Sequence, residues 1–151
     1  MKKILAIAGG VALAAASVAL HPSAQAQSFP APPKSCIWLR EVTTGTQPIR
    51  KTITTANSNA NVDFAVPAGT QFKKYMAQLI PENDARYTAE VNLIYNDNST
   101  SRVATRTIEG RRFFLYNLPF QPPTGRQPIR VNTRVTGQRG IAYRVAVMAC
   151  P

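Results

Sequence analysis

The strongest constraint on this chain is a two-residue alternation of apolar and polar side chains over residues 87–95. The apolar members of this stretch are Tyr87, Ala89, Val91, Leu93 and Tyr95, and the polar ones between them include Thr88, Glu90 and Asn92. Residues two positions apart point to the same face of a β-strand. The spacing therefore predicts a strand with one buried face and one solvated face.

Similar short stretches recur along the chain and are separated by turn residues. The predicted strands cover 36–43, 49–55, 62–66, 71–80, 87–95, 100–108, 111–118, 129–135 and 141–150. Regularly spaced short strands without a helical pattern predict an all-β fold, an antiparallel β-sandwich of eight to nine strands that is jelly-roll-like or immunoglobulin-like. The stretches 87–95, 100–108 and 111–118 are expected to form a meander, with residues 109–110 as a two-residue connection.

The two cysteines lie in the first and the last predicted strands. Cys36 opens one and Cys150 closes the other, so a disulfide would tie both ends of the domain together. In the chain-entropy model a bridge over so long a loop contributes roughly 4–5 kcal/mol. If the two strands are antiparallel neighbours, Trp38 lies near Met148 and Val42 near Arg144.

The first 26 residues have the features of a signal peptide. Lys2 and Lys3 precede an apolar run over residues 4–20, and Ala24-Gln25-Ala26 provides small residues at a cleavage site. We expect cleavage after Ala26, a Pro-rich leader over residues 27–35 and a single domain over residues 36–151. The expected location is the periplasm or the cell exterior, and no transmembrane span is expected in the mature chain.

The composition of the expected mature chain argues against catalysis. The sole histidine, His21, lies in the signal, and no serine has a recognisable nucleophile motif, so we expect a non-enzymatic protein without a cofactor or metal centre. Two loops, Glu82–Asp84 and Asn96–Asn98, carry oxygen ligands that suit calcium, although turn formation explains the same residues. The sequence leaves calcium binding there undecided.

Positive charge is concentrated in the C-terminal part. Removal of Lys2 and Lys3 leaves 16 basic against 7 acidic residues, and residues 102–144 hold nine arginines but the single acid Glu109. An arginine fork binds phosphate, sulfate or carboxylate through parallel hydrogen bonds. The candidate ligand-binding residues are Arg130, Arg134, Arg102, Arg106 and Arg144, with Trp38 as a stacking residue.

The best candidate for such a binding surface is one row of side chains on the predicted strand 129–135. Arg130, Asn132 and Arg134 alternate with Ile129, Val131 and Val135, so the first set is predicted to face solvent and the second set the core. The opposing interpretation, that the arginines are scattered charges that keep the protein soluble, has equal weight.

The leading functional hypothesis is an exported basic binding module that engages an anionic surface polymer, either a polysaccharide or lipopolysaccharide. The alternative is a structural or assembly subunit of a cell-surface structure that associates through its sheet edges. Nucleic acid is not an expected physiological partner of an exported protein. The identity of the ligand, the strand order and the oligomeric state remain open at this stage.

Overall fold

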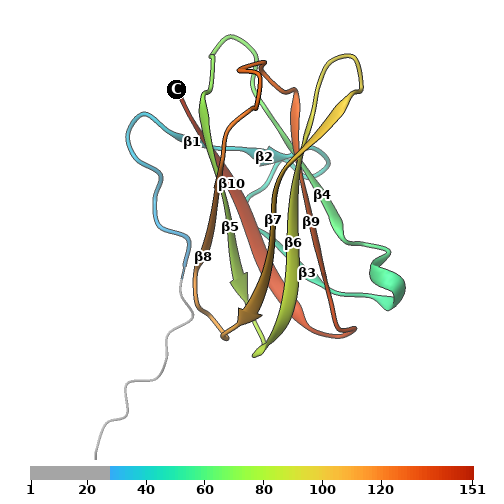
Figure 1. Ribbon diagram of the computed structural model, residues 1–151. Coiled ribbons are helices and arrows are strands. Elements are labelled where there is room, and N and C mark those ends of the chain that lie inside the picture. The colour runs from blue at the N-terminus through green and yellow to red at the C-terminus, as the bar shows by residue number, and fades with distance from the viewer. Residues whose placement is uncertain (1–27) are drawn as a thin grey trace, which may run out of the picture.

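The computed structural model describes residues 28–151, which form a sandwich of two antiparallel β-sheets packed face to face (Figure 1). The predicted all-β sandwich class is therefore confirmed. The predicted signal peptide, residues 1–26, lies outside the described residues. Within residues 28–151, no helix has the length and apolar character needed to cross a membrane.

The first sheet has the order β1-β10-β5-β8, and β3 also pairs with β10. Its strands are β1 (Ile37–Trp38), β3 (Ile49–Thr52), β5 (Lys74–Pro81), β8 (Tyr116–Phe120) and β10 (Ala142–Cys150). The second sheet has the order β2-β4-β9-β6-β7. Its strands are β2 (Arg40–Glu41), β4 (Asn61–Ala65), β6 (Ala85–Ile94), β7 (Thr100–Gly110) and β9 (Arg130–Gly137). A short 3₁₀ turn, η1 (Thr55–Asn57), lies between β3 and β4.

The core lies between the inner faces of the two sheets and follows the predicted alternation. Leu93 of β6, Val131 of β9 and Val147 of β10 are fully buried. The Tyr87 hydroxyl, also buried, donates to the carbonyl oxygen of Ala142 at 2.8 Å and so links the sheets. The prediction that Ile129 is buried is wrong: it is 41% exposed, because it precedes β9 and lies beyond the last ladder pair at one end of the sandwich.

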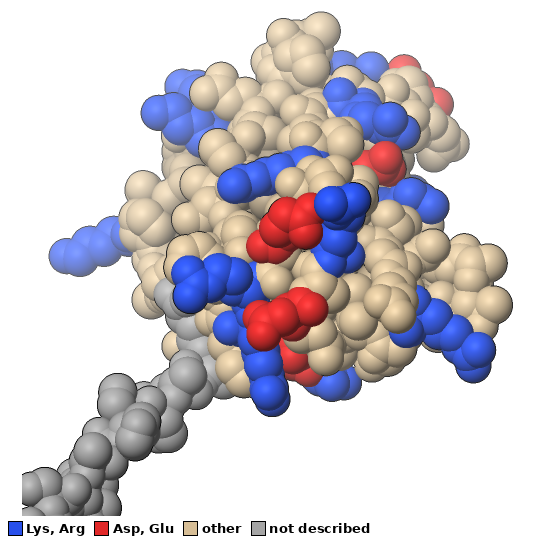
Figure 2. Space-filling model, turned by 60° about the horizontal axis from the view of Figure 1, so that its bottom comes forward, with Lys and Arg blue, Asp and Glu red and all other residues tan. Residues whose placement is uncertain are grey.

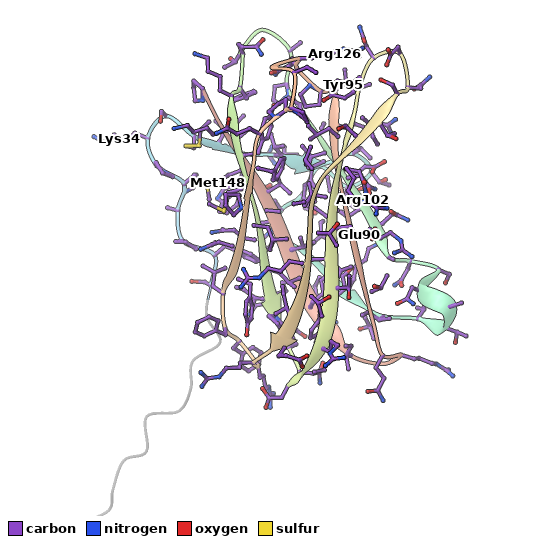
Figure 3. The ribbon with its side chains drawn as sticks, in the orientation of Figure 1. Lys34, Glu90, Tyr95, Arg102, Arg126 and Met148 are labelled. Atoms are coloured by element: carbon purple, nitrogen blue, oxygen red, sulfur yellow. A yellow bond between two sulfur atoms is a disulfide. The ribbon has the colours of Figure 1, made fainter. Side chains whose placement is uncertain are left out.

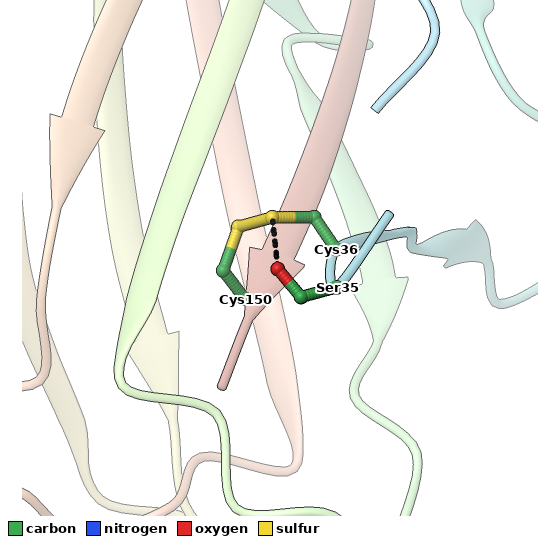
Figure 4. The surroundings of a disulfide bond; sticks show 3 residues. All are labelled: Ser35, Cys36 and Cys150. Carbon is green, nitrogen blue, oxygen red and sulfur yellow. Dashed lines mark hydrogen bonds between the residues drawn. A yellow bond between two sulfur atoms is a disulfide. The ribbon is translucent and has the colours of Figure 1, made fainter. Parts of the chain in front are cut away.

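The predicted disulfide is present between Cys36 and Cys150, whose Cα atoms lie 4.3 Å apart (Figure 4). The predicted pairing of Trp38 with Met148 is confirmed. The pairing of Val42 with Arg144 is wrong, because the first predicted strand divides between the sheets. This division also raises the number of strands within residues 28–151 to ten.

The division occurs at Leu39. β1 pairs with β10 in the first sheet, whereas β2 pairs with β4 in the second. Leu39 lies between them and is 1% exposed, and its N–H still donates to Val147 O in the first sheet. Val42 then donates its N–H to Asp63 O in the second sheet. Burial of Leu39 in the core thus accompanies the passage from one sheet to the other.

The predicted three-stranded meander is also wrong. β6 and β7 form the expected hairpin, but β8 pairs with β5 in the opposite sheet. Gly110 ends β7 in close contact with its partner strand, where a Cβ atom would lie 2.7 Å from Ala85 O. Residues 111–115, which we call the crossing loop, then carry the chain from the second sheet to the first at the lower end of the molecule in Figure 1.

Candidate functional site

Three of the predicted binding residues converge on the outer surface of the second sheet. Cross-strand pairing aligns Asp63, Asn132, Asn92 and Arg102 in one row across β4, β9, β6 and β7. The neighbouring rows add Glu90, Arg130 and Arg134. Directly opposed residues share a face of the sheet, so these seven side chains form one surface, which we call the polar face.

Hydrogen bonds between strands fix the centre of the polar face. Asn92 Nδ2 donates to Asn132 Oδ1 at 3.3 Å, and Asn132 Nδ2 donates to Asp63 Oδ1 at 2.7 Å. The second oxygen of Asp63 accepts from Arg130 Nη1 at 3.3 Å. Amide and guanidinium groups are thereby held in place on the sheet before any ligand arrives.

Two acids offset most of the charge on this face. Glu90 Oε2 lies 3.8 Å from Arg102 Nη2 and 3.7 Å from Arg134 Nη1, and Asp63 pairs with Arg130. Figure 3 shows Glu90 and Arg102 on the side of the molecule formed by the second sheet. Three guanidinium groups thus face two carboxylates, which leaves a single net positive charge.

Arg106 does not join the polar face. Its register partner is Ala89, a core residue, so the side chain leaves β7 on the opposite side from Arg102. Arg106 Nη1 donates to Asn117 O of β8 at 3.2 Å, and the guanidinium carbon lies 5.9 Å from the centre of the Tyr116 ring. This arginine spans the open side of the sandwich between β7 and β8.

Arg144 and Trp38 lie on the first sheet. Arg144 Nε is 3.5 Å from Glu82 Oε1, and Glu82 also pairs with Arg50 at 2.7 Å. The Trp38 ring meets the Phe29 ring edge-on at 6.1 Å between centroids. Trp38 and Arg144 both line a depression of about 230 Å³. The six predicted residues therefore occupy three separate places.

The crossing loop holds an arginine-aromatic cluster that the sequence analysis missed. The guanidinium carbon of Arg112 lies 4.6 Å from the centre of the Phe113 ring, and that of Arg111 lies 5.8 Å from the Phe114 ring. Phe114 is 49% exposed. The signal for this loop was present in the sequence, since two arginines followed by two phenylalanines break the two-residue period expected of a strand.

Hydrogen bonds from three consecutive backbone N–H groups anchor the crossing loop. Arg111 N donates to the Tyr116 hydroxyl at 3.1 Å, Arg112 N donates to Asp84 Oδ1 at 2.7 Å, and Phe113 N donates to Pro81 O at 2.7 Å. Figure 2 looks at this end of the sandwich and shows basic side chains gathered around acidic ones.

The two loops considered for calcium use side-chain oxygen atoms in hydrogen bonds within the protein, one in a turn and the other to a distant strand. Asp97 Oδ1 accepts from the N–H and hydroxyl of Ser99, and these bonds, with a smaller contribution from Arg126, lower the pKa of Asp97 to about 2. In the other loop, Asn83 Oδ1 accepts the Ala142 N–H at 2.8 Å. Within residues 28–151, no group of three or more acidic, histidine or cysteine side chains is arranged to hold a metal ion.

Among known proteins, the chain is similar to solved structures. No family model matches the chain, and no curated protein matches it. A mutant of a family 29 carbohydrate-binding module is similar over 77% of this chain and 91% of its own, with a TM-score of 0.46 and 7% identity. The family 22 carbohydrate-binding module and catalytic module of a Clostridium thermocellum xylanase 10B, complexed with xylohexaose, match 78% of this chain with a TM-score of 0.41 and 10% identity. This match spans 25% of the xylanase chain.

Proposed function

We propose that this chain is an exported, non-catalytic binding module whose polar face engages an anionic surface polymer, either an acidic polysaccharide or lipopolysaccharide. One observation carries the proposal: Arg102, Arg130 and Arg134, which come from two strands, converge around the Asn92–Asn132 pair. Export is supported by the signal-like N-terminus and by the Cys36–Cys150 disulfide, a bond typical of oxidising compartments.

The spacing on the polar face suits a polymer better than a single small anion. Arg130 and Arg134 are four residues apart on β9, and same-face residues in a strand lie about 6.5–7 Å apart, so the two side chains leave the strand roughly 13–14 Å from one another. An acidic polysaccharide carries charges along its length and hydroxyl groups between them, so one chain can contact both arginines at once. The amides of Asn92 and Asn132 lie between the arginines and provide partners for those hydroxyls.

The carboxylates of the polar face hold its arginines in position. Asp63 accepts from both Asn132 and Arg130, and Glu90 lies between Arg102 and Arg134. Each acid thus holds neighbouring donors at a fixed place on the sheet. We therefore assign Asp63 and Glu90 to the binding surface and to no chemical step.

The sheet edges favour this proposal over an assembly subunit that adds strands. β7 and β8 are the edge strands on one side of the two sheets, and Arg106 bridges them through Asn117 O. A strand from another molecule would have to displace this contact before it could pair with β8. A charged side chain across an edge is a known means by which β-proteins avoid edge-to-edge pairing.

The test is the double variant Arg130→Ala and Arg134→Ala, with Lys34→Ala and Lys73→Ala as a control of equal charge loss. Figure 3 shows Lys34 on the opposite side of the molecule from Arg102. We expect the arginine variant to bind polygalacturonate more weakly than the control does, with a smaller dependence on salt. Both variants should keep the free energy of unfolding within about 1 kcal/mol of the parent. Equal binding by the two variants would reject the polar face as the site.

A further inference from the structure

The two arginines of the crossing loop differ from those of the polar face in their partners. Within residues 28–151, the seven ion pairs involve Arg50, Arg86, Arg102, Arg126, Arg130, Arg134 and Arg144. The guanidinium groups of Arg111 and Arg112 instead lie over the rings of Phe114 and Phe113. Their positive charge is therefore not offset by a paired carboxylate in the described part of the chain.

Contact with a ring also leaves these arginines able to bind. A cation–π contact uses none of the guanidinium N–H donors in a bond to a carboxylate, so these donors remain available to an anion. The ring restricts the orientation of the guanidinium, so less conformational freedom is lost when a ligand binds. Arg111 and Arg112 are both exposed.

The backbone of the crossing loop is held in an unfavourable conformation. Phe113 has φ +62°, in the left-handed region, which costs a residue with a bulky side chain on the order of 1–2 kcal/mol. The bonds to Pro81 O, Asp84 Oδ1 and the Tyr116 hydroxyl keep it there. Backbone strain of this kind persists where the surroundings over-determine it, and it clusters at ligand-binding sites.

A hollow of about 450 Å³ lies at the crossing loop, lined by Asp84, Arg111, Arg112 and Phe113. This volume falls within the roughly 300–1,000 Å³ of small-molecule sites. Its lining combines two cations, one carboxylate and one aromatic ring. We propose that the crossing loop is a second binding site, separate from the polar face, which takes an acidic sugar residue such as a uronate or a sulfated ring.

Each part of such a sugar has a counterpart in the hollow. Its carboxylate or sulfate matches the forks of Arg111 and Arg112, its hydroxyl groups can donate to Asp84, and its C–H face can pack on an aromatic ring. An anionic membrane fits less well, because Phe114 is the single phenylalanine of the crossing loop that is largely exposed, which leaves little apolar surface to enter a bilayer.

This inference goes beyond the proposed function, since it concerns a different site and survives failure of the polar face. The variants are Arg111→Ala with Arg112→Ala, Arg111→Lys with Arg112→Lys, and Arg130→Ala with Arg134→Ala, with the Lys34→Ala and Lys73→Ala protein as the charge control. Binding is measured by calorimetry with a galacturonate hexasaccharide, a galactose hexasaccharide, and vesicles of phosphatidylcholine and phosphatidylglycerol. Thermal unfolding checks that each variant is folded.

We expect the alanine pair at 111 and 112 to weaken binding of the galacturonate hexasaccharide about tenfold relative to the control. The lysine pair should recover only part of this loss, because a point charge lacks the fork. Neutral galactose should bind far more weakly. Equal galacturonate binding by the alanine pair and the control, or binding to vesicles but not to galacturonate, would overturn the inference. Unchanged binding by the 130 and 134 pair would instead reject the polar face alone.

Discussion

The polar face and the crossing loop both present arginines, yet they hold them by different means. On the polar face, paired strands place Arg102, Arg130 and Arg134 beside Asp63 and Glu90, so ion pairs and an amide network fix them. In the crossing loop, Arg111 and Arg112 rest on aromatic rings, and the loop itself is fixed through its backbone.

The two sites differ in whether the groups that hold the arginines in place also neutralise their charge. The polar face gains its order from carboxylates, and the same carboxylates reduce its attraction for an anion. The crossing loop gains its order from backbone hydrogen bonds, one of them to the Asp84 carboxylate, and from ring contacts, and neither of its two guanidinium groups lies in one of the seven ion pairs of residues 28–151. We therefore expect the polar face to bind through several weak contacts along a polymer, and the crossing loop to bind one acidic group more tightly.

The largest expected effect concerns the scaffold beneath the polar face. Leu93 is fully buried on the inner side of β6, so Leu93→Ala should lower the free energy of unfolding by about 2–5 kcal/mol through lost burial and a residual cavity. Chemical denaturation measures this loss. Leu93 belongs to neither proposed site, so the variant should keep its galacturonate affinity at both sites under conditions in which it is folded. A loss below about 0.5 kcal/mol would contradict the assignment of Leu93 to the core.

A smaller effect tests the strain of the crossing loop directly. At position 113 the left-handed backbone favours glycine, so Phe113→Gly should be more stable than Phe113→Ala by about 1 kcal/mol. Comparing two truncated side chains removes the common loss of the ring from the measurement.

Asn132 in the middle of β9 supplies the matched control. There the backbone is extended, and Asn132→Gly should be less stable than Asn132→Ala. Thermal and denaturant unfolding of all four variants gives the two differences. The same sign at both positions would argue against strain at Phe113.

A third prediction concerns the charge balance of the polar face. Glu90→Gln removes the acid shared by Arg102 and Arg134 and retains its size, so polygalacturonate should bind about two- to fivefold more tightly at low salt. Glu109→Gln is the control, since Glu109 pairs with Arg86 outside the polar face. An equal gain in both variants would indicate a response to net charge and not to this surface.

The smallest effect should appear in acid. Hydrogen bonds from the backbone N–H groups of Thr44 and Thr43 lower the pKa of Glu41 from 4.5 to about 2. Because this pKa is lower in the folded state, the carboxylate contributes stability above about pH 4.5, and that stability is lost as the pH falls towards 2.

Thermal unfolding of the parent and of Glu41→Gln over this pH range tests the effect, and we expect the variant to lose less stability on acidification. Arginines stay charged over this pH range, so the contacts of Arg111 and Arg112 with the rings of Phe114 and Phe113 should not change with pH. Parallel pH curves for parent and variant would show that Glu41 does not make this contribution.

The sequence carried enough local information to define most strands and the disulfide. Alternation over residues 87–95 correctly separated buried Leu93 from the polar-face residue Glu90, because side-chain direction in a strand depends only on residue parity. The same parity correctly placed Arg130, Asn132 and Arg134 on one outer face. The pairing of Cys36 with Cys150 followed from their being the two cysteines of a chain with a signal-like N-terminus.

Sheet membership could not be predicted in this way, because it depends on contacts between residues far apart in the sequence. The stretch 36–43 alternates like one strand, yet burial of Leu39 divides it between two sheets. For the same reason Arg106 and Arg144, which looked equivalent to Arg102 in sequence, lie elsewhere. A register shift in the β6–β7 ladder, between Val91 and Asn92, puts Arg106 on the opposite side of β7 from Arg102 although the two have the same parity, and Arg144 belongs to the other sheet.

The sequence by itself thus determined which residues of most strands face the core, since side-chain direction is local wherever a strand has no bulge. The tertiary structure decided which arginines share a surface. It also decided the conformation of the crossing loop. The left-handed backbone at Phe113 is maintained by hydrogen bonds to Pro81, Asp84 and Tyr116, and these residues come close to the loop only when both sheets have formed. A bulky residue adopts this conformation where such long-range contacts offset its cost, and local sequence preference alone would place it in the extended region.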